Sequence, residues 1–223
     1  MRSIIFSFKK SSRIRRIKKN FQISDLRYLF KRYGVQVAFV FLILLGLTVG
    51  SIYAKNADTQ LLNSLDFLFT TNLDVRLKES AIGIFSACFA SDFLFLFTLF
   101  LLGLAPWGIP IMPLVVFFKG FGTGLTAGYL FITYSLTGAG FYLLVILPGT
   151  FLFCMALMMF ATGAFKLSKL MFLHTISKTP PKQPIRKSLT EFCYRSMTFL
   201  IMTFSAAILD AVLWMLFSSA FKF

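Results

Sequence analysis

The chain has 223 residues, of which 57% are hydrophobic and only 14% are charged, and its net charge is +15. A soluble domain carries about 25% charged residues. Here the charged residues are missing from long stretches, each close to the roughly 20 residues that a helix needs to cross a bilayer. This composition excludes an ordinary water-soluble domain and predicts an all-α, polytopic integral membrane protein in a lipid bilayer.

The first 33 residues are strongly basic, with eleven Lys or Arg residues against one acid, Asp25. Ile14, Ile17 and Phe21 recur among these charges at helical spacing, which is typical of a basic amphipathic segment on anionic lipid. A solvated topology determinant without a partner is the alternative. Because the basic residues flank apolar stretches, they favour a membrane surface as their partner and not nucleic acid.

The rest of the chain is predicted to form one membrane domain, residues 34–220. The first apolar run is too long for the apolar part of a cleaved signal peptide, so we expect it to be retained. Five spans follow from the hydropathy pattern. Their expected limits are about 34–54, 82–104, 107–134, 141–167 and 197–220.

The polar segment between the first two spans, residues 55–80, contains a possible short amphipathic helix. Leu61, Leu65 and Leu68 would lie on one face of that helix. Such an apolar face can dock a partner protein or pack against the top of the helix bundle, and the sequence leaves both open.

Prolines are expected to interrupt the helices at two places, because proline removes a backbone donor and clashes with the preceding turn. Pro106, Pro110 and Pro113 fall within eight residues and predict a tight turn after the second span. Pro148 is predicted to kink the fourth span.

The distribution of Lys and Arg predicts the orientation. The N-terminal segment and residues 168–193 are rich in basic residues, whereas residues 55–80 contain three basic residues and four acids. Five spans place the two basic segments on one side, which the positive-inside rule assigns to the cytoplasm. We therefore expect the N-terminus inside and the C-terminus outside.

Three ionisable residues fall inside expected spans: Asp92, Lys119 and Asp210. Each costs roughly 2.5–3.5 kcal/mol at the middle of the membrane, so such residues are candidates for function. Their depths along the helices overlap, and we hypothesise that Lys119 pairs with one or both aspartates inside the bundle. The cluster could be structural and determine which helices pack together, or it could form an ion or proton path.

Gly120, Gly124 and Gly128 follow Lys119 at four-residue spacing. Small residues at this spacing let two membrane helices approach closely. The face could pack within the chain or form a subunit interface. Nothing in the sequence specifies an oligomeric state.

Enzymatic and metal-binding patterns are missing from the sequence. There is no HExxH, P-loop or GxSxG motif, and the one histidine, His174, stands apart from the three cysteines. A metal site needs clustered ligands, so we expect no metal and no cofactor. The polar segments are shorter than the roughly 40 residues that an unaided fold requires. We expect a protein that is not an enzyme.

Several short stretches are similar to the stage II sporulation protein M family, and the similarity spans about residues 30–220. They are Leu102-Gly103, Gly108-Ile109-Pro110, Lys119-Gly120-Phe121-Gly122-Thr123-Gly124, Gly128-Tyr129-Leu130 and Leu147-Pro148. The resemblance implies a component of the endospore engulfment machinery in a bacterial plasma membrane. It also implies a scaffold that localises extracytoplasmic peptidoglycan hydrolase partners.

Two functional hypotheses follow. The first is the non-enzymatic engulfment scaffold, and the second is a small-solute or ion transporter subunit that uses Asp92, Lys119 and Asp210. A dry, mutually paired charge cluster would favour the scaffold, whereas a water-lined cavity that reaches these residues would favour transport.

Overall fold

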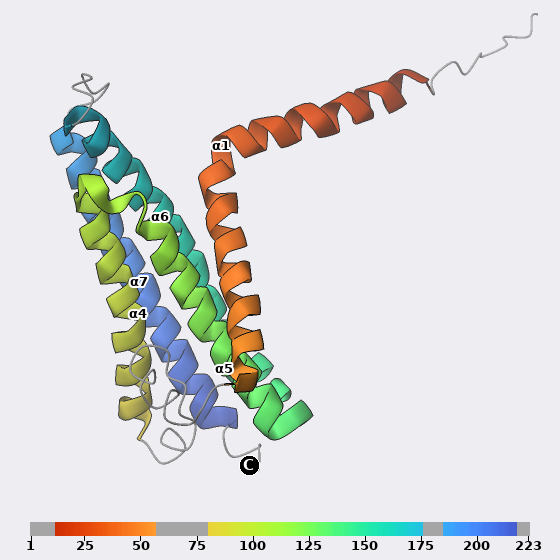
Figure 1. Cartoon of the computed structure of the whole chain (residues 1–223), viewed down its shortest axis with the longest axis vertical. Helices are drawn as coiled ribbons and strands as arrows, with labels where there is room; N and C mark the ends of the chain where they lie inside the picture. The colour runs from red at the N-terminus through yellow and green to blue at the C-terminus, as the bar shows by residue number, and fades with distance from the viewer. Residues whose placement is uncertain (1–11, 57–79, 176–184, 218–223) are drawn as a thin grey trace, which may run out of the picture. The chain divides into compact units, whose positions relative to one another are not determined.

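The computed structural model describes residues 12–56, 80–175 and 185–217, with side chains from Tyr33 onward. Throughout these ranges the regular structure is helical, as the composition predicts (Figure 1). The elements are α1 (Ser12–Tyr53), η1 (Ala54–Asn56), α4 (Ala81–Leu104), η2 (Pro106–Gly108), α5 (Met112–Phe141), the π-helix η3 (Tyr142–Ile146), α6 (Leu147–Thr175) and α7 (Ile185–Phe217).

The chain divides into two compact units, residues 1–37 and residues 38–223. The described part of the first unit is the N-terminal portion of α1, and its backbone is helical from Ser12. The second unit contains the remaining helices. Leu61, Leu65 and Leu68, which were expected to form a docking face, lie outside the described residues.

Within the described ranges, four helical segments are long and apolar enough to cross a membrane: Tyr33–Asn56, Ala81–Leu104, Met112–Thr175 and Ile185–Phe217. The expectation of five separate helices is therefore corrected. The expected third and fourth spans, 107–134 and 141–167, share one helical segment of 64 residues. The turn expected between them, at residues 135–140, keeps helical hydrogen bonding around one non-helical residue, Ser135.

The 64-residue segment reverses its direction at Ser135. This residue has φ 51° and ψ −129°, a conformation that is uncommon for any residue except glycine. A straight helix of this length would span about 96 Å. Instead the hydroxyl of Ser168, near its end, donates to the carbonyl of Ala105, just before its start, at 2.7 Å. Helices α5 and α6 are therefore antiparallel (Figure 1).

Helices α4, α6 and α7 pack through aromatic side chains. The Phe192 ring on α7 lies 5.6 Å from that of Phe100 on α4 and 5.3 Å from that of Phe160 on α6. Towards the start of α4, Phe85 contacts Phe204 with ring centroids 5.3 Å apart. The end of α4 therefore meets the start of α7, and these two helices are antiparallel.

Helices α1 and α5 are in contact through glycines. A Cβ atom on Gly120 would overlap the carbonyl of Ile43, and one on Gly124 would overlap that of Leu47. A Cβ on Gly128 would lie 2.7 Å from the Cβ of Ala54. Because both sets of residues increase in the same direction, the two helices are parallel here.

The α1 side of this contact is also glycine-rich. A Cβ on Gly46 or Gly50 would overlap the backbone of α5 at Phe117 or Phe121, respectively. The hydroxyl of Ser51 donates to the carbonyl of Gly124 at 3.1 Å. Gly46, Gly50 and Ala54 repeat at four-residue spacing on α1, as the glycines do on α5, so both sides of the contact leave a small-residue pattern in the sequence.

Three of the described prolines occupy positions where the helix needs no backbone donor or compensates for its loss: Pro106, Pro113 and Pro148. Pro106 opens η2 and Pro113 lies in the first turn of α5, where the amide hydrogens lack helical acceptors in any case. Before Pro148, the chain forms the π-helix η3, and the amide of Leu147 donates to the carbonyl of Tyr142, five residues back. The wider turn accommodates the missing donor of Pro148 and the helix continues through it.

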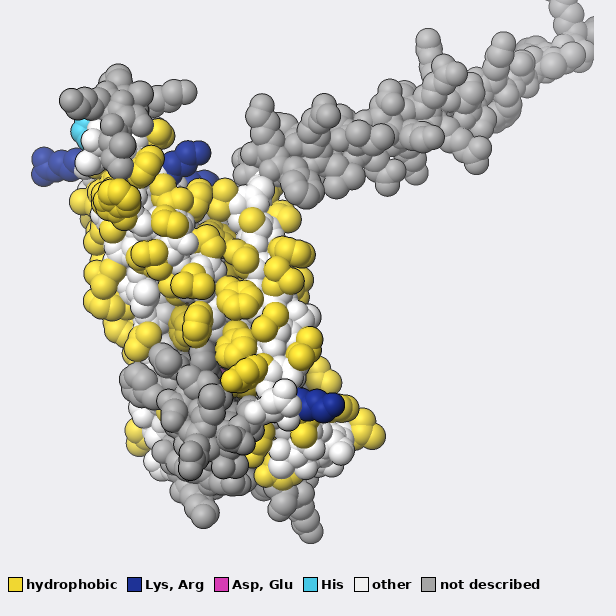
Figure 2. Space-filling view, in the orientation of Figure 1, with side chains coloured by type: hydrophobic (Ala, Val, Ile, Leu, Met, Phe, Trp, Pro, Cys, Tyr) yellow, Lys and Arg dark blue, Asp and Glu magenta, His cyan; other side chains and the backbone are white. Residues whose placement is uncertain are grey.

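The visible middle of the second unit is covered by hydrophobic side chains, while the visible basic side chains lie near its ends (Figure 2). At one end, the last turns of α6 and the first turns of α7 carry five Lys or Arg residues. They are Lys166, Lys169, Arg186, Lys187 and Arg195. This distribution suits a bundle whose middle faces lipid and whose ends face water.

The glycine contact predicts a position-dependent effect of alanine. Gly124→Ala should lower the stability of the bundle by about 1–3 kcal/mol, because the added methyl group overlaps the α1 backbone. Gly163→Ala on α6 is the matched control, since a Cβ there meets nothing within 4 Å. The control should be neutral or slightly stabilising through helix propensity. Thermal unfolding in detergent measures both, and equal midpoints for the two variants would refute the contact.

Candidate functional site

A buried ion pair connects α4 and α5. The Nζ atom of Lys119 donates to Oδ1 of Asp92 at 2.6 Å, and each residue is only 6% exposed. The ammonium group also lies 5.1 Å from the centre of the Phe95 ring and 4.8 Å from that of Phe153. The aromatic faces add cation–π attraction on the sides that the carboxylate leaves open.

Burial makes this pair a determinant of helix position. Each charge alone would be expensive in an apolar bundle, so removing one partner leaves an uncompensated charge and costs about 3–5 kcal/mol. Asp92 comes from α4, Lys119 from α5 and Phe153 from α6. These three helices must therefore keep their relative position for the charge to stay compensated.

Asp210, on α7, occupies a space that a glycine provides. A Cβ on Gly149 would overlap Oδ1 of this carboxylate. Gly149 immediately follows Pro148, so the irregular start of α6 lies where the acid approaches it. Asp210 also interacts electrostatically with Lys119. The structure therefore places the three predicted ionisable residues in one neighbourhood, with Lys119 bonded directly to Asp92.

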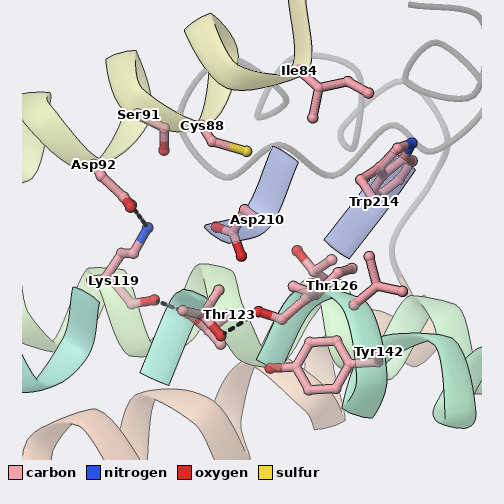
Figure 3. A pocket seen from close by; sticks show the side chains of 13 residues that line it. Ile84, Cys88, Ser91, Asp92, Lys119, Thr123, Thr126, Tyr142, Asp210 and Trp214 are labelled. Carbon is pink, nitrogen blue, oxygen red and sulfur yellow. Dashed lines mark hydrogen bonds and ion pairs between the residues drawn. The ribbon is translucent and has the colours of Figure 1, made fainter. Parts of the chain in front are cut away.

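All three line one cavity of about 40 Å³ between α4, α5, η3, α6 and α7 (Figure 3). About 10–15 Å³ is enough for one water molecule, so the cavity can hold water. Its polar lining consists of the three ionisable residues and of Ser91, Thr123, Thr126, Tyr142 and Thr150, with Cys88 and Trp214 beside them.

The threonine hydroxyls in this lining use their hydrogens within their own helices. Thr123 donates to the carbonyl of Lys119 at 2.9 Å, Thr126 to that of Gly122 at 3.1 Å and Thr150 to that of Ile146 at 2.9 Å. A hydroxyl oxygen has two lone pairs in addition to its hydrogen. While these bonds are made, the three oxygens still present lone pairs to a molecule in the cavity.

The cavity lies in one half of the bundle. Among its lining residues, Ile84 is about 5 Å and Asp92 about 17 Å from the start of α4, at 1.5 Å per residue. Trp214 is in the last turn of α7, and Asp210 is about 10 Å from its end. The cavity therefore extends from near the start of α4 toward the middle of the bundle.

Sequence reasoning missed most of the neutral lining. Thr123 and Thr126 could have been found, because they follow Lys119 by four and seven residues and share its helical face. Tyr142 could not, since its position depends on the reversal at Ser135 and on η3. Among the described residues, no group of three or more His, Cys, Asp or Glu side chains could hold a metal ion.

The ion pair predicts that neutralising both partners is better tolerated than neutralising one. Lys119→Met alone should lower stability by about 3–5 kcal/mol and reduce the amount of protein in the membrane. Adding Asp92→Asn should recover more of that loss than adding Asp210→Asn, because Asp92 is the direct partner. Thermal unfolding and quantitative immunoblotting of membranes check this. Purely additive losses in both double variants would exclude direct pairing.

Comparison with known proteins places these features in a family. The family model described as stage II sporulation protein M matches residues 38–213, which include the charge cluster and every residue that lines the cavity except Trp214. Searches of the curated proteins and of the solved structures gave no match. The matched family implies a sporulation-related membrane protein and is not known as an enzyme family. The chain belongs to the stage II sporulation protein M family.

Proposed function

We propose that this protein is a non-enzymatic membrane scaffold of the endospore engulfment machinery in a bacterial plasma membrane. Its role would be to hold peptidoglycan hydrolase partners on the extracytoplasmic side. The observation that carries the proposal is the family match over residues 38–213. It covers nearly the whole second unit, so the membrane bundle itself is the part that the family shares.

The packing of the bundle supports a scaffold. The ion pair holds α4 to α5, and the glycine contact holds α1 to α5. Both interactions require close and specific helix positions, because a buried charge must stay paired and a backbone contact tolerates no added side chain. Such a bundle keeps its described helices at defined positions, which a protein that positions partners needs.

We propose a topology of five crossings, with the reversal at Ser135 on the outside. The portion of α1 after Val37 runs parallel to α5, and α5 starts at the end where α6 finishes and α7 begins. The first crossing would therefore enter from the basic end of the bundle. The positive-inside rule assigns this end to the cytoplasm, which gives an N-terminus inside and a C-terminus outside.

The basic N-terminal residues 1–33 would then face the cytoplasmic leaflet. Their eleven Lys and Arg residues would be attracted to anionic lipid, at about 1 kcal/mol for each basic residue near the surface. In this proposal the segment anchors the entry of α1, and residues 34–220 form the membrane domain.

Cysteine labelling from outside tests the topology. Two variants should react with a membrane-impermeant maleimide in intact cells. They are Thr137→Cys, at an exposed position two residues beyond the reversal, and Ser64→Cys. Ser188→Cys should react only after the membrane is opened. The variants are made in a background without the three native cysteines. Labelling of Ser188→Cys in intact cells, or protection of Thr137→Cys, would contradict five crossings in this orientation.

For partner docking, we propose the segment between α1 and α4. It is the longest outside segment in this topology, and Leu61, Leu65 and Leu68 would form an apolar face there if it is helical. The competing use of these leucines is packing against the bundle.

Changing Leu61, Leu65 and Leu68 together to serine separates the two uses. The triple variant should lose co-purification with the hydrolase partner, while its membrane level stays that of the wild type. The matched control changes three polar residues of the same segment, Asn63, Thr70 and Asn72, to serine and should keep the partner. A parallel fall of membrane level and partner recovery would assign the leucines to the bundle.

One observation supports the second candidate, an ion or small-solute transporter subunit. The polar cavity reaches Asp210 as well as the Asp92–Lys119 pair, so the charge cluster combines a direct pair with a space for water. A scaffold needs no such space.

A further inference from the structure

A groove lies between α6 and α7 at the basic end of the bundle. Its volume is about 170 Å³, whereas about 10–15 Å³ is enough for one water molecule. The lining includes Gly163 and Lys166 from α6 and Ser188, Glu191 and Arg195 from α7. The three charged residues among these are exposed, so the groove opens onto the surface of the bundle. It can therefore admit a group much larger than water.

The base of this groove is apolar and held by packing. Leu167 and Phe192 line it and are each only 4% exposed. The Phe192 ring stacks on the rings of Phe100 and Phe160. At Gly163 the groove has free space, because a Cβ there would meet nothing within 4 Å. The groove thus combines an apolar base with a charged rim.

The rim carries an excess of positive charge. Lys166 and Arg195 are basic, and Glu191 is the one acid among the lining residues, so two positive charges and one negative charge give a net charge of +1. Within the described part of the chain, no ion pair involves Lys166 or Arg195. Arginine binds phosphate through two parallel hydrogen bonds, and lysine binds it as a point charge. A phosphate ligand with one net negative charge would neutralise the rim.

The groove lies at the level expected for lipid headgroups. The hydropathy pattern predicts that the fourth span ends at about residue 167 and that the last span starts at about residue 197. Lys166 and Arg195 are therefore at the membrane boundary. Gly163 lies about 4.5 Å further along α6 toward the apolar middle of the bundle. A ligand in the groove would meet cations at the boundary and apolar surface below them, which suits a phosphate that carries acyl chains.

We propose that this groove is a binding site for one anionic phospholipid, of the class to which phosphatidylglycerol belongs. The phosphate lies between Lys166 and Arg195, and an acyl chain passes Gly163. The headgroup reaches Ser188 and Glu191, where hydroxyl groups of a glycerol headgroup can donate to the carboxylate. This inference is independent of the scaffold role and of the side that this end of the bundle faces. It concerns one defined site and not the general attraction of residues 1–33 to lipid.

The test measures thermal unfolding of the purified full chain in detergent micelles at about 0.1 M salt, where the Debye length is about 10 Å. Phosphatidylglycerol is titrated into the micelles, and phosphatidylethanolamine with the same acyl chains is the comparison. The second lipid has the same phosphate, but its ammonium group cancels the charge. Phosphatidylglycerol should raise the midpoint by mass action and half-saturate at a mole fraction at least about fivefold lower than the comparison lipid. Equal stabilisation by the two lipids would overturn the inference.

Two double variants separate the groove from a diffuse attraction to the basic end. One combines Lys166→Ala with Arg195→Ala, and the control combines Lys169→Ala with Arg186→Ala, which are exposed basic residues outside the lining. Both variants remove two positive charges. The half-saturating mole fraction should rise at least about tenfold in the first, because charge-assisted contacts are lost, and less than about threefold in the control. Equal rises in both variants would overturn the inference.

Glycerol 3-phosphate distinguishes a lipid from a soluble phosphate ester. It offers the phosphate charge without an acyl chain, so it should leave the midpoint of the wild type nearly unchanged. If it stabilises the protein as much as phosphatidylglycerol does, the ligand is a soluble phosphate ester and the assignment to a lipid is overturned.

Gly163→Leu keeps the test decisive if the groove double variant does not accumulate. The added side chain enters free space, so the midpoint without anionic lipid should stay near that of the wild type, and no charge changes. The half-saturating mole fraction of phosphatidylglycerol should rise about fivefold or more, because the leucine occupies the path of the acyl chain. An unchanged response to phosphatidylglycerol in Gly163→Leu would likewise overturn the inference.

Discussion

The ion pair between Asp92 and Lys119 is the constraint on which the arrangement of the helices depends. Neither charge can face lipid at this depth without a large cost, so α4 and α5 must meet where the two side chains do. Phe95 and Phe153 enclose the ammonium group, which adds α6 to the same requirement. Apolar side chains alone would not impose it, because lipid and leucine are equally apolar and one apolar helix face packs much like another.

Glycine supplies the second constraint by allowing contacts that any side chain would block. On α5, Gly120, Gly124 and Gly128 bring the backbone of α1 into contact. On α6, Gly149 makes room for the carboxylate of Asp210. One helix thus uses glycine to associate with a neighbour and another uses it to admit a charge. Since Lys119 is adjacent to Gly120, α5 carries the ion pair and the glycine contact along a shared stretch.

These constraints place a polar cavity between helices whose positions are fixed. The pair and the glycine contacts give fixed helix positions, and the polar cavity lies between the same helices. The match to the stage II sporulation protein M family covers the same helices.

The sequence by itself determined the all-helical membrane character, because long uncharged stretches have no other stable use. It also identified the three ionisable residues, since charges inside apolar runs are conspicuous. The turn expected at residues 135–140 lies where the chain reverses, at Ser135, but it keeps a helical backbone, so the expected third and fourth spans form one helical segment. Only the tertiary structure decided that Asp92, and not Asp210, bonds Lys119. It alone placed Tyr142 and Thr150 beside α5, because contacts between distant segments follow from packing and leave no local pattern in the sequence.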